Sequence, residues 1–301
     1  MSVLAIIVSL LIEQWRPLGE RKAVAGALGG WAGWLERSFN AGERHHGIVA
    51  WLVAVLPAVI ASAALHYVLY AVTPLLALAF NIGVLYLTLG FRQVSHYFTD
   101  LQVAVKAGDI DRARALLEEW RGASGVVRSR EEVIRLAIEE ALLASHRHVF
   151  GVLLWYLLLP GPSGAILYRL AAYFASRWRE LGAFGGFATR AFYYLEWPAV
   201  RLTAAAFAIV GDFEDAVYCW RTQARNWPDP NAGVILAAGA GAMGVRLGMP
   251  VQEVEGMNPR PELGVGDPAE GPFLDSTVGL LWRAVVVWVF SVVVVSMARL
   301  L

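Results

Sequence analysis

Long apolar runs alternate with shorter polar segments along this chain, and the last run is the clearest. Residues 279–301 read GLLWRAVVVWVFSVVVVSMARLL. A helix of this length, rising about 1.5 Å per residue, can cross about 30 Å of hydrocarbon. Arg283 and Arg299 stand near its two ends, where their long side chains can reach the headgroups. The pattern therefore predicts a C-terminal transmembrane helix.

A second apolar block, residues 48–91, is too long for one crossing. It is interrupted at Thr73-Pro74, and proline lacks the amide donor that a helix interior needs. The block therefore predicts two spans joined by a tight turn. A shorter apolar run at residues 3–12 is followed by Glu13 and not by a small-residue cleavage site, so it predicts an uncleaved anchor or a partly inserted helix.

Three further apolar stretches are broken by glycine, proline or polar residues: 149–174, 199–210 and 232–247. The first is split by the Gly-Pro-Ser-Gly turn at residues 161–164, and each half is too short to cross alone. We expect either one kinked span or a re-entrant hairpin. Re-entrant backbone needs protein or a wet cavity around it, so these stretches are expected to line a cavity.

The polar segment at residues 92–148 has the pattern of amphipathic helices outside the lipid. Asp109 follows a glycine and can cap a helix with apolar residues at about 3.6-residue spacing. After a Gly/Ser break a second apolar stripe runs to Leu142. Glu131, Arg135 and Glu139 stand four apart on the other side of this second helix, and we expect that side to be solvated.

The composition agrees with a membrane protein: 57% of residues are hydrophobic and 17% are charged. The net charge is zero, without a dense basic run, which argues against a nucleic-acid partner. The segments at residues 13–46 and 92–148 are rich in arginine and should share one face, which the positive-inside rule makes cytoplasmic. The single Cys219 cannot form an intrachain disulfide and is expected to be a small packed residue.

These patterns predict an all-α fold, namely a polytopic helical membrane protein with broken or re-entrant helices and a cytoplasmic helical segment. The expected location is the inner cell membrane, crossed several times, with the lipid bilayer as partner and oligomerisation left open. The segments are an N-terminal anchor, basic loop and transmembrane hairpin, cytoplasmic amphipathic helices, a membrane core, a polar loop and a C-terminal transmembrane helix: residues 1–91, 92–148, 149–251, 252–278 and 279–301.

Short motifs give little chemistry by themselves. Residues 239–244 match GxGxxG by letter, but no strand or βαβ pattern surrounds them, so close helix packing through small residues is the better interpretation. Neither His45-His46 nor His146 with His148 has useful metal-ligand spacing, and no metal site is predicted. His66 lies within an apolar span, where it either lines a cavity or makes a structural hydrogen bond.

The segment DPNAG at residues 229–233 has the turn chemistry of a helix start, where Asn231 can cap and free amides can hold an anion. It belongs to the longer stretch WRTQARNWPDPNAGVILAAGAGAMGVRLGMPV. That stretch resembles a Ser-Pro-Asn-Ala-Gly helix start and a Gly-Val-Arg-Leu run of the CobD/CbiB family of cobalamin-biosynthesis membrane proteins, with Asp229 in place of the serine. HYFTDLQVAVKAGDIDRAR, FGVLLWYLLLPGPSGAILYRL and WPAVRLTA resemble three further segments of this family, which also has more distant AmpE relatives.

The resemblance implies an adenosylcobinamide-phosphate synthase, which joins the corrinoid cobyric acid to aminopropanol or its phosphate by forming an amide. It also implies ATP and Mg²⁺ as the activating agents. The residues that carry over as contacts to corrinoid, amide or phosphate are Arg201, Asn231 and Arg246, with Thr203 and Asp109 as weaker candidates. No catalytic residue is assigned.

Two polar motifs of the family are replaced in this chain. Its Glu-Asn-x-x-Asp-Gly motif would fall at residues 139–151, which read EEALLASHRHVFG, and its Asn-Thr-Leu-Asp-Ser stretch is replaced by AAYFA at residues 171–175. Acyl activation by ATP needs acidic groups to hold Mg²⁺. The alternative is therefore a non-catalytic, AmpE-like signalling or cell-envelope protein of the inner membrane.

Overall fold

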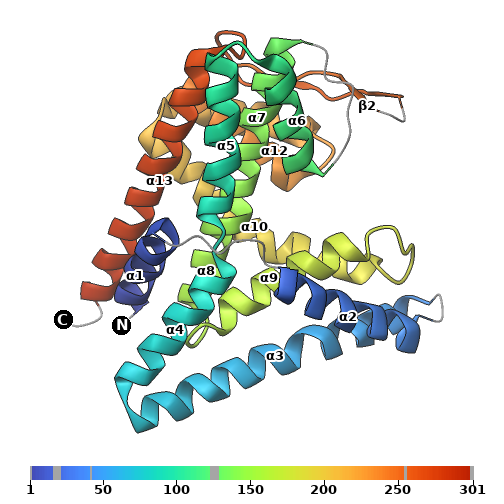
Figure 1. The fold of residues 1–301 in the computed structure, drawn as a ribbon, viewed down its shortest axis with the longest axis vertical. Coiled ribbons are helices and arrows are strands. Elements are labelled where there is room, and N and C mark those ends of the chain that lie inside the picture. The colour runs from blue at the N-terminus through green and yellow to red at the C-terminus, as the bar shows by residue number, and fades with distance from the viewer. Residues whose placement is uncertain (1, 16–21, 41–42, 123–128, 254–255, 299–301) are drawn as a thin grey trace. The chain divides into compact units, whose positions relative to one another are not determined.

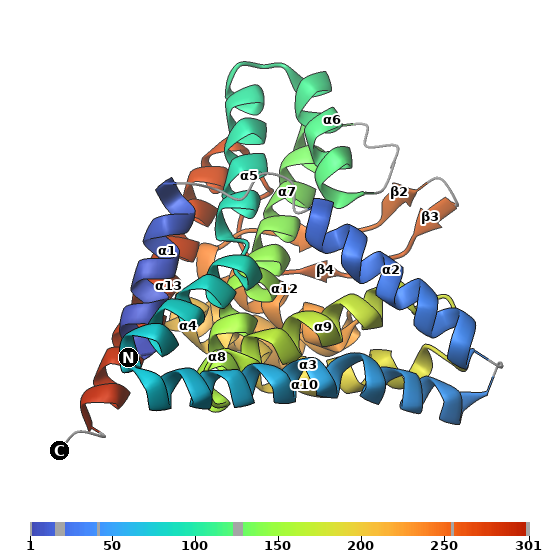
Figure 2. The ribbon, with the colours of Figure 1, turned by 60° about the horizontal axis from the view of Figure 1, so that its bottom comes forward.

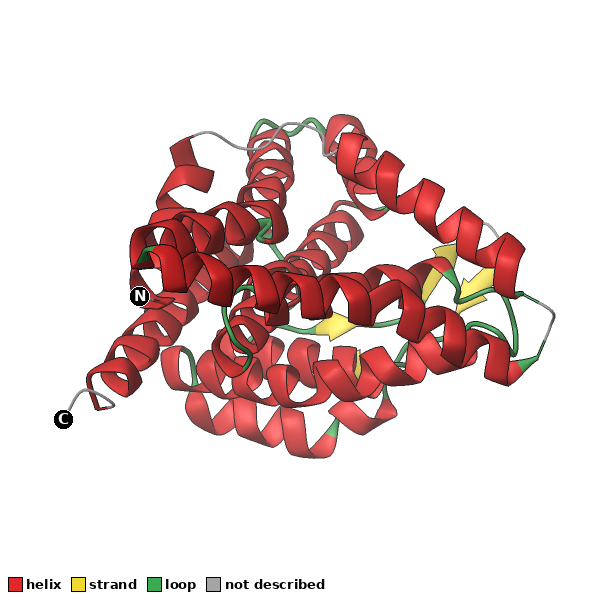
Figure 3. Ribbon diagram, turned by 90° about the horizontal axis from the view of Figure 1, so that it is seen from below, coloured by secondary structure: helices red, strands yellow, loops and turns green. Residues whose placement is uncertain are grey.

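The computed structural model describes residues 2–15, 22–40, 43–122, 129–253 and 256–298. Most of this part of the chain is helical, and its strands are two or three residues long (Figure 3). The predicted all-α fold is confirmed. Contacts within the chain define two compact units. Unit 1 comprises Met1–Gly90 and Gly151–Pro198, and unit 2 comprises Phe91–Phe150 and Ala199–Leu301.

Unit 1 is a group of helices that pack in pairs. Helix α1 packs on α4, and α9 packs on α3 (Figure 2). The helices of this unit are α1 (Ser2–Trp15), α2 (Lys22–Phe39), α3 (Arg44–Val72), α4 (Pro74–Thr88), α8 (Gly151–Leu158), α9 (Ser163–Arg177) and the first half of α10 (Gly186–Val210).

The predicted break at Thr73-Pro74 is confirmed, because α3 ends at Val72 and α4 begins at Pro74. Thr73 adopts an extended conformation, and its Oγ1 accepts a hydrogen bond from the Leu76 amide at 3.3 Å. Proline fits the first helical position because its missing N–H is not needed there. Helix α4 has 15 residues, which is short for a complete crossing by itself.

The apolar stretch around residue 161 forms a helical hairpin, not one kinked span. Helices α8 and α9 pack on each other across a four-residue turn in which Gly161 has φ +57°. A Cβ built on Gly164 would lie 1.8 Å from the carbonyl oxygen of Trp155. The two backbones therefore touch at Gly164, and a larger residue there would separate them.

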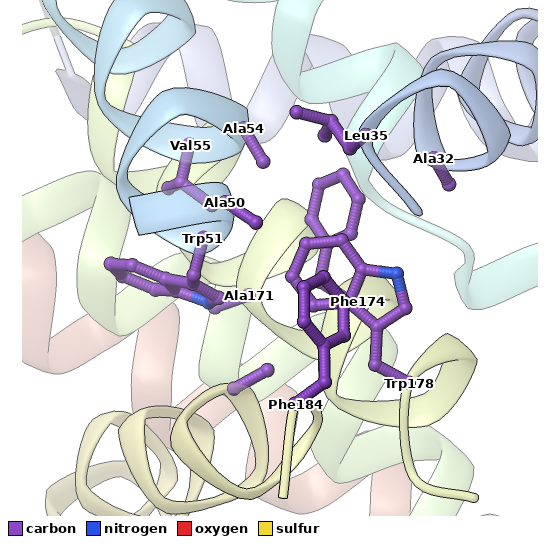
Figure 4. Close-up of a cluster of buried hydrophobic side chains, with 11 residues drawn as sticks. Ala32, Leu35, Ala50, Trp51, Ala54, Val55, Ala171, Phe174, Trp178 and Phe184 are labelled. Atoms are coloured by element: carbon purple, nitrogen blue, oxygen red, sulfur yellow. The ribbon is translucent and has the colours of Figure 1, made fainter. Parts of the chain in front are cut away.

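An aromatic cluster forms the buried centre of unit 1 (Figure 4). The ring centroids of Phe174 and Trp178 are 4.6 Å apart, and those of Trp178 and Phe184 are 5.0 Å apart. Small residues and aliphatic side chains of α2 and α3 pack against these rings, among them Leu35 and Val55. The cluster fixes the chain between the end of α9 and the start of α10.

Unit 2 combines a helical layer with two short β-hairpins. Helices α5, α6 and α7 lie side by side (Figure 1). The elements are α5 (Phe91–Lys106), α6 (Ile110–Arg121), α7 (Arg130–Ser145), the π-helix η1 (His146–Phe150), the second half of α10, α11 (Phe213–Thr222), the 3-10 helix η2 (Ala224–Asn226), α12 (Pro230–Met243), β1 (Leu247–Gly248), β2 (Val251–Glu253), β3 (Gly256–Asn258), β4 (Glu262–Leu263) and α13 (Gly271–Ala298). Strand β1 pairs with β4 and β2 with β3, both antiparallel.

The predicted apolar stripe of α7 is buried, but the expected solvation of its charged side is wrong for two residues. Arg135 is 7% exposed and Glu139 is 4% exposed. The reason is that β1 packs on α7 and covers these side chains. The predicted boundary between residues 148 and 149 falls within the continuous helix Arg130–Leu158, which is formed by α7, η1 and α8.

The GxGxxG letters at residues 239–244 lie in α12 and its C-cap, as the packing interpretation predicts. A Cβ on Gly239 would meet a methyl of Leu142 at 2.8 Å, and a Cβ on Gly241 would meet the Asp215 carbonyl oxygen at 2.4 Å. Gly244 has φ +65° and ends the helix, a backbone conformation that favours glycine. Cys219 of α11 is fully buried, as expected.

Three helices of the described chain are long and apolar enough to cross a membrane: Arg44–Val72, Arg130–Leu158 and Gly271–Val294. The predicted C-terminal helix is confirmed, and it begins eight residues earlier than expected, at Gly271. Together with the helical fold, these helices identify a helical membrane protein. Exposed apolar side chains on α3 and α13, such as Ile60 and Phe290, are consistent with contact to lipid.

Candidate functional site

The centre of the candidate site in unit 2 is the π-helical turn η1. His146 is 1% exposed, and its Nδ1 lies 3.0 Å from Oγ1 of Thr203 on α10. The Thr203 hydroxyl donates to the carbonyl oxygen of Ala199 at 2.9 Å, so its oxygen accepts from His146. π-Helical turns are rare in proteins, and those that occur are often found at functional sites.

The next residue of η1 brings a cation to the start of α12. Nη2 of Arg147 lies 3.9 Å from Oδ2 of Asp229, and both side chains are partly exposed. The other oxygen of Asp229 accepts hydrogen bonds from the amides of Asn231 at 3.0 Å and Ala232 at 3.4 Å. The helix cap is therefore Asp229, and the expectation that Asn231 caps is wrong. The reason is that Asn231 lies one residue inside the helix and is 1% exposed.

This geometry also changes the expectation of an anion at these amides. The two amides are already bonded to the Asp229 carboxylate, which supplies the negative charge that the helix N-terminus favours. A positive charge near this end is the guanidinium of Arg147, which faces Asp229. An anionic substrate group would thus approach Arg147 more favourably than the amides of α12.

A buried ion pair between Glu139 and Arg260 links α7 to the β-hairpins of unit 2. Nη1 of Arg260 lies 2.7 Å from Oε2 of Glu139, and Oε1 of Glu139 accepts from the Gly248 amide at 2.9 Å. The Arg260 guanidinium also donates to the carbonyl oxygen of Met249 and lies over the Trp227 ring, 5.1 Å from its centroid. Trp227 belongs to the loop before α12, so this pair connects α7, the β-hairpins and the start of α12.

The structure brings some of the predicted site residues together and separates others. Thr203 contacts His146 of η1, and Asn231 lies next to the Asp229 that faces Arg147. Arg201 is half-buried two residues before Thr203 on α10.

Arg246 lies beyond the far end of α12, a helix about 21 Å long. Its Nη1 pairs with Oε1 of Glu262 at 3.5 Å. Asp109 is exposed, and its Oδ1 caps α6 by accepting from the Arg112 amide at 3.0 Å. The predicted role of Asp109 as a helix cap is confirmed, and its role as a substrate contact stays a prediction.

Sequence reasoning missed His146 and Arg147 as members of this site. The spacing of His146 and His148 argues against a metal pair, but it says nothing about a contact of His146 with Thr203, 57 positions away. One signal was available: residues 139–151, where the family motif would fall, carry polar residues of their own, the HRH of positions 146–148.

Two other groups of polar residues belong to unit 1. His66 Nδ1 lies 3.0 Å from Oδ1 of the buried Asn81, so the hydrogen-bonded interpretation of His66 is supported. Glu43, His45 and His46 have donor atoms within 4.8 Å of one another. One carboxylate and two imidazoles suit a transition metal better than Mg²⁺, which prefers oxygen ligands.

The described residues of unit 2 do not fit a protein-built Mg²⁺ site. No group of three acidic or histidine ligands is found there within the described ranges. Two carboxylates near the site are already engaged, Glu139 by Arg260 and Asp229 by the amides of α12.

Comparison with known proteins covers nearly the whole chain. The sequence profile of the family described as CobD/Cbib protein matches residues 3–297. The cobalamin biosynthesis protein CobD of Stutzerimonas stutzeri (strain A1501) is 33% identical over 297 residues, 96% of each chain. The protein of the same name from Chromobacterium violaceum is 35% identical over 221 residues, covering 71% of this chain and 70% of the relative. No solved structure matches the chain significantly.

Proposed function

This chain belongs to the CobD/CbiB family, and from that membership we propose that it acts in cobalamin biosynthesis, joining a carboxylate of cobyric acid to aminopropanol or its phosphate. The observation that carries the proposal is the match over residues 3–297, which includes all helices of the candidate site. The names of the relatives favour this function over the non-catalytic AmpE-like alternative.

Amide formation from a carboxylate needs activation, because the carboxylate is a poor electrophile. ATP supplies this by giving the acid a phosphate leaving group. We propose that Arg147 and Arg201 hold anionic groups of the corrinoid or of a phosphate, since guanidinium groups pair well with both. Arg147 is accessible for this role, because its side chain is 38% exposed.

His146 and Asn231 are proposed as positioning residues, because both are almost fully buried. The hydrogen bond from His146 to Thr203 fixes the turn that presents Arg147, and Asn231 lies beside the cap that faces it. Arg246 contacts Glu262 and Asp109 contacts the Arg112 amide, so these contacts of both lie outside this cluster. Their predicted substrate contacts are the weaker part of the proposal.

Mg²⁺ enters this proposal as a companion of ATP, because it commonly binds through the phosphates of a nucleotide with few protein ligands. The remaining parts of the proposal concern location and partners. We propose an inner-membrane protein that crosses the bilayer several times, with its arginine-rich loops on the cytoplasmic side. A corrinoid is the proposed substrate, nucleic acid is not a proposed partner, and an oligomer is compatible with the fold.

The test is complementation of a bacterial strain that cannot join cobyric acid to its aminopropanol arm. We expect growth with the wild-type chain, and loss of growth with Arg147→Gln, Arg201→Gln or Asn231→Ala. Arg221→Gln, an exposed arginine of α11, is the matched control and should support growth. Membrane-inserted wild-type protein that fails to restore growth would refute the proposal and favour the non-catalytic alternative.

A further inference from the structure

A shallow pocket of about 390 Å³ in unit 1 is lined by three arginines. Arg44 is the first residue of α3, Arg179 follows the end of α9, and Arg190 lies in the second turn of α10. Gly186 and Thr189 of α10 contribute to the same wall. The volume falls within the range of about 300–1,000 Å³ that is usual for small-ligand pockets.

The positive charge of this pocket is not neutralised within the part of the chain that the structure describes. Arg44 and Arg179 make no hydrogen bond or ion pair with a described residue. Nε of Arg190 donates to the carbonyl oxygen of Gly186 in its own helix at 3.1 Å, which leaves its charge without a counterion. Three like charges on one small surface repel one another, and an anion would relieve that repulsion.

The carboxylates close to these arginines in the sequence have other partners or lie outside the pocket lining. Glu36 accepts from Nε of Arg177 at 3.1 Å and from the indole N–H of Trp178 at 3.1 Å. Glu43 pairs with His45 at 3.0 Å. Glu180 does not line the pocket.

Two helix N-termini add to this positive potential. Helix α3 begins at Arg44 and α10 begins at Gly186, and neither has an acidic residue in its first turn. The first amides of a helix have no partner within the helix and carry partial positive charge. An anion in the pocket would therefore meet backbone dipoles as well as guanidinium groups.

The backbone that carries the pocket is fixed before any ligand arrives. Trp178 and Phe184 are fully buried on either side of the loop between α9 and α10 (Figure 4). A Cβ on Gly185 would lie 1.7 Å from the Trp178 carbonyl oxygen, and a Cβ on Gly47 would lie 2.0 Å from the Phe184 carbonyl oxygen. Such close contacts hold the loop against the start of α3, so little ordering entropy would be lost on binding.

We propose that this pocket binds a phosphoryl group, held by Arg44, Arg179 and Arg190. The planar guanidinium fork matches the oxygens of a phosphate and binds them in pairs. The same chemistry is offered by a lipid headgroup, since α3 is long enough to cross a membrane and the pocket lies at its first residue, and by a soluble phosphate compound. This inference does not depend on the proposed function.

The test uses the full-length protein in neutral detergent with pyrophosphate as the soluble probe, measured by titration calorimetry. A second arm uses nanodiscs that contain phosphatidylglycerol and phosphatidylcholine, with the retained lipid identified by native mass spectrometry. The variant is R44Q/R179Q/R190Q. The matched control is R112Q/R221Q/R225Q, which removes the same charge from three exposed positions outside the pocket.

We expect the wild type and the control to bind at least one probe, and the pocket variant to bind it at least about tenfold more weakly, a change of about 1.4 kcal/mol. Pyrophosphate binding identifies a soluble ligand, and selective retention of phosphatidylglycerol identifies a lipid. The single variant R179Q changes a residue in an exposed loop and should weaken binding severalfold. It replaces the triple variant in the test if the triple variant does not fold. Equal binding by wild type and pocket variant, or binding of neither probe by the wild type, would overturn the proposal.

Discussion

The buried pair of Glu139 and Arg260 gives the sharpest prediction about stability. The side chains are 6% and 10% exposed, and their closest oxygen and nitrogen are 2.7 Å apart. The substitution Arg260→Met removes the directly bonded cation and leaves the carboxylate with the Gly248 amide at 2.9 Å and with the nearby charge of Arg135. Removing one partner of a buried pair costs about 3–5 kcal/mol, because the remaining charge stays buried without its direct partner.

The partner substitution Glu139→Gln keeps an oxygen for the Gly248 amide but leaves the Arg260 charge uncompensated. We expect a cost in the same range of about 3–5 kcal/mol. The double variant E139Q/R260M has neither buried charge, so it should be less destabilised than either single variant. The coupling energy of this double-mutant cycle should be about 2 kcal/mol or more.

The assay is unfolding of the purified protein in mixed micelles with increasing SDS, followed by tryptophan fluorescence. Lys106→Gln is the control, since it breaks an ion pair with Asp275 in which both side chains are more than half exposed. That change should cost about 0–1 kcal/mol. Single variants at Glu139 and Arg260 that lose no more stability than this control, or whose effects simply add, would refute the reasoning.

Three further outcomes follow from single sites. Gly164→Ala should destabilise unit 1 by at least about 1–3 kcal/mol in the same unfolding assay, because its Cβ would lie 1.8 Å from a carbonyl oxygen of α8. The control is Gly83→Ala, whose Cβ would have no neighbouring atom within 4 Å, and it should be neutral or stabilising by up to about 1 kcal/mol. Thr203→Val should cost about 1–3 kcal/mol, measured by thermal unfolding, because the buried His146 loses its acceptor, and Thr203→Ser should retain most of the stability. Burial raises the pKa of the Cys219 thiol to about 11, so maleimide labelling at pH 8 should be slow in the folded protein and fast after unfolding. Fast labelling of the folded protein at pH 8 would contradict this expectation. Because the unfolded thiol ionises at lower pH than the folded one, the contribution of Cys219 to stability is present below about pH 9 and is lost as the pH rises toward 11.

Features of the fold that depend on neighbouring residues could be predicted from the sequence. The break at Thr73-Pro74 and the cap at Asp109 follow from local backbone chemistry, and the buried stripe of α7 follows from helical periodicity. The small residues of α12 indicated close packing for the same reason, because their spacing places them on neighbouring parts of a helix surface.

Features that depend on distant segments could not be predicted in this way. Arg135 and Glu139 looked solvated, because the strand that covers them begins at Leu247, more than a hundred residues later. The contact of His146 with Thr203 likewise joins two helices, and the sequence pattern around either residue does not show that these helices come together.

The arginine pocket of unit 1 shows the same limit. Arg44 and Arg179 are 135 positions apart in the sequence, and each looks like an ordinary arginine at a helix end. Their shared wall exists because two glycines allow the loop before α10 to touch the start of α3.

The most direct test of the proposed function is the reaction itself. Purified full-length protein in detergent or nanodiscs is incubated with cobyric acid, ATP, Mg²⁺ and either aminopropanol or its phosphate, and the products are analysed by mass spectrometry. We expect an ATP-dependent product whose mass equals that of the acid plus the amine minus one water, absent with Arg147→Gln and present with Arg221→Gln. Folded wild-type protein that forms no such amide with either amine would contradict the proposed function.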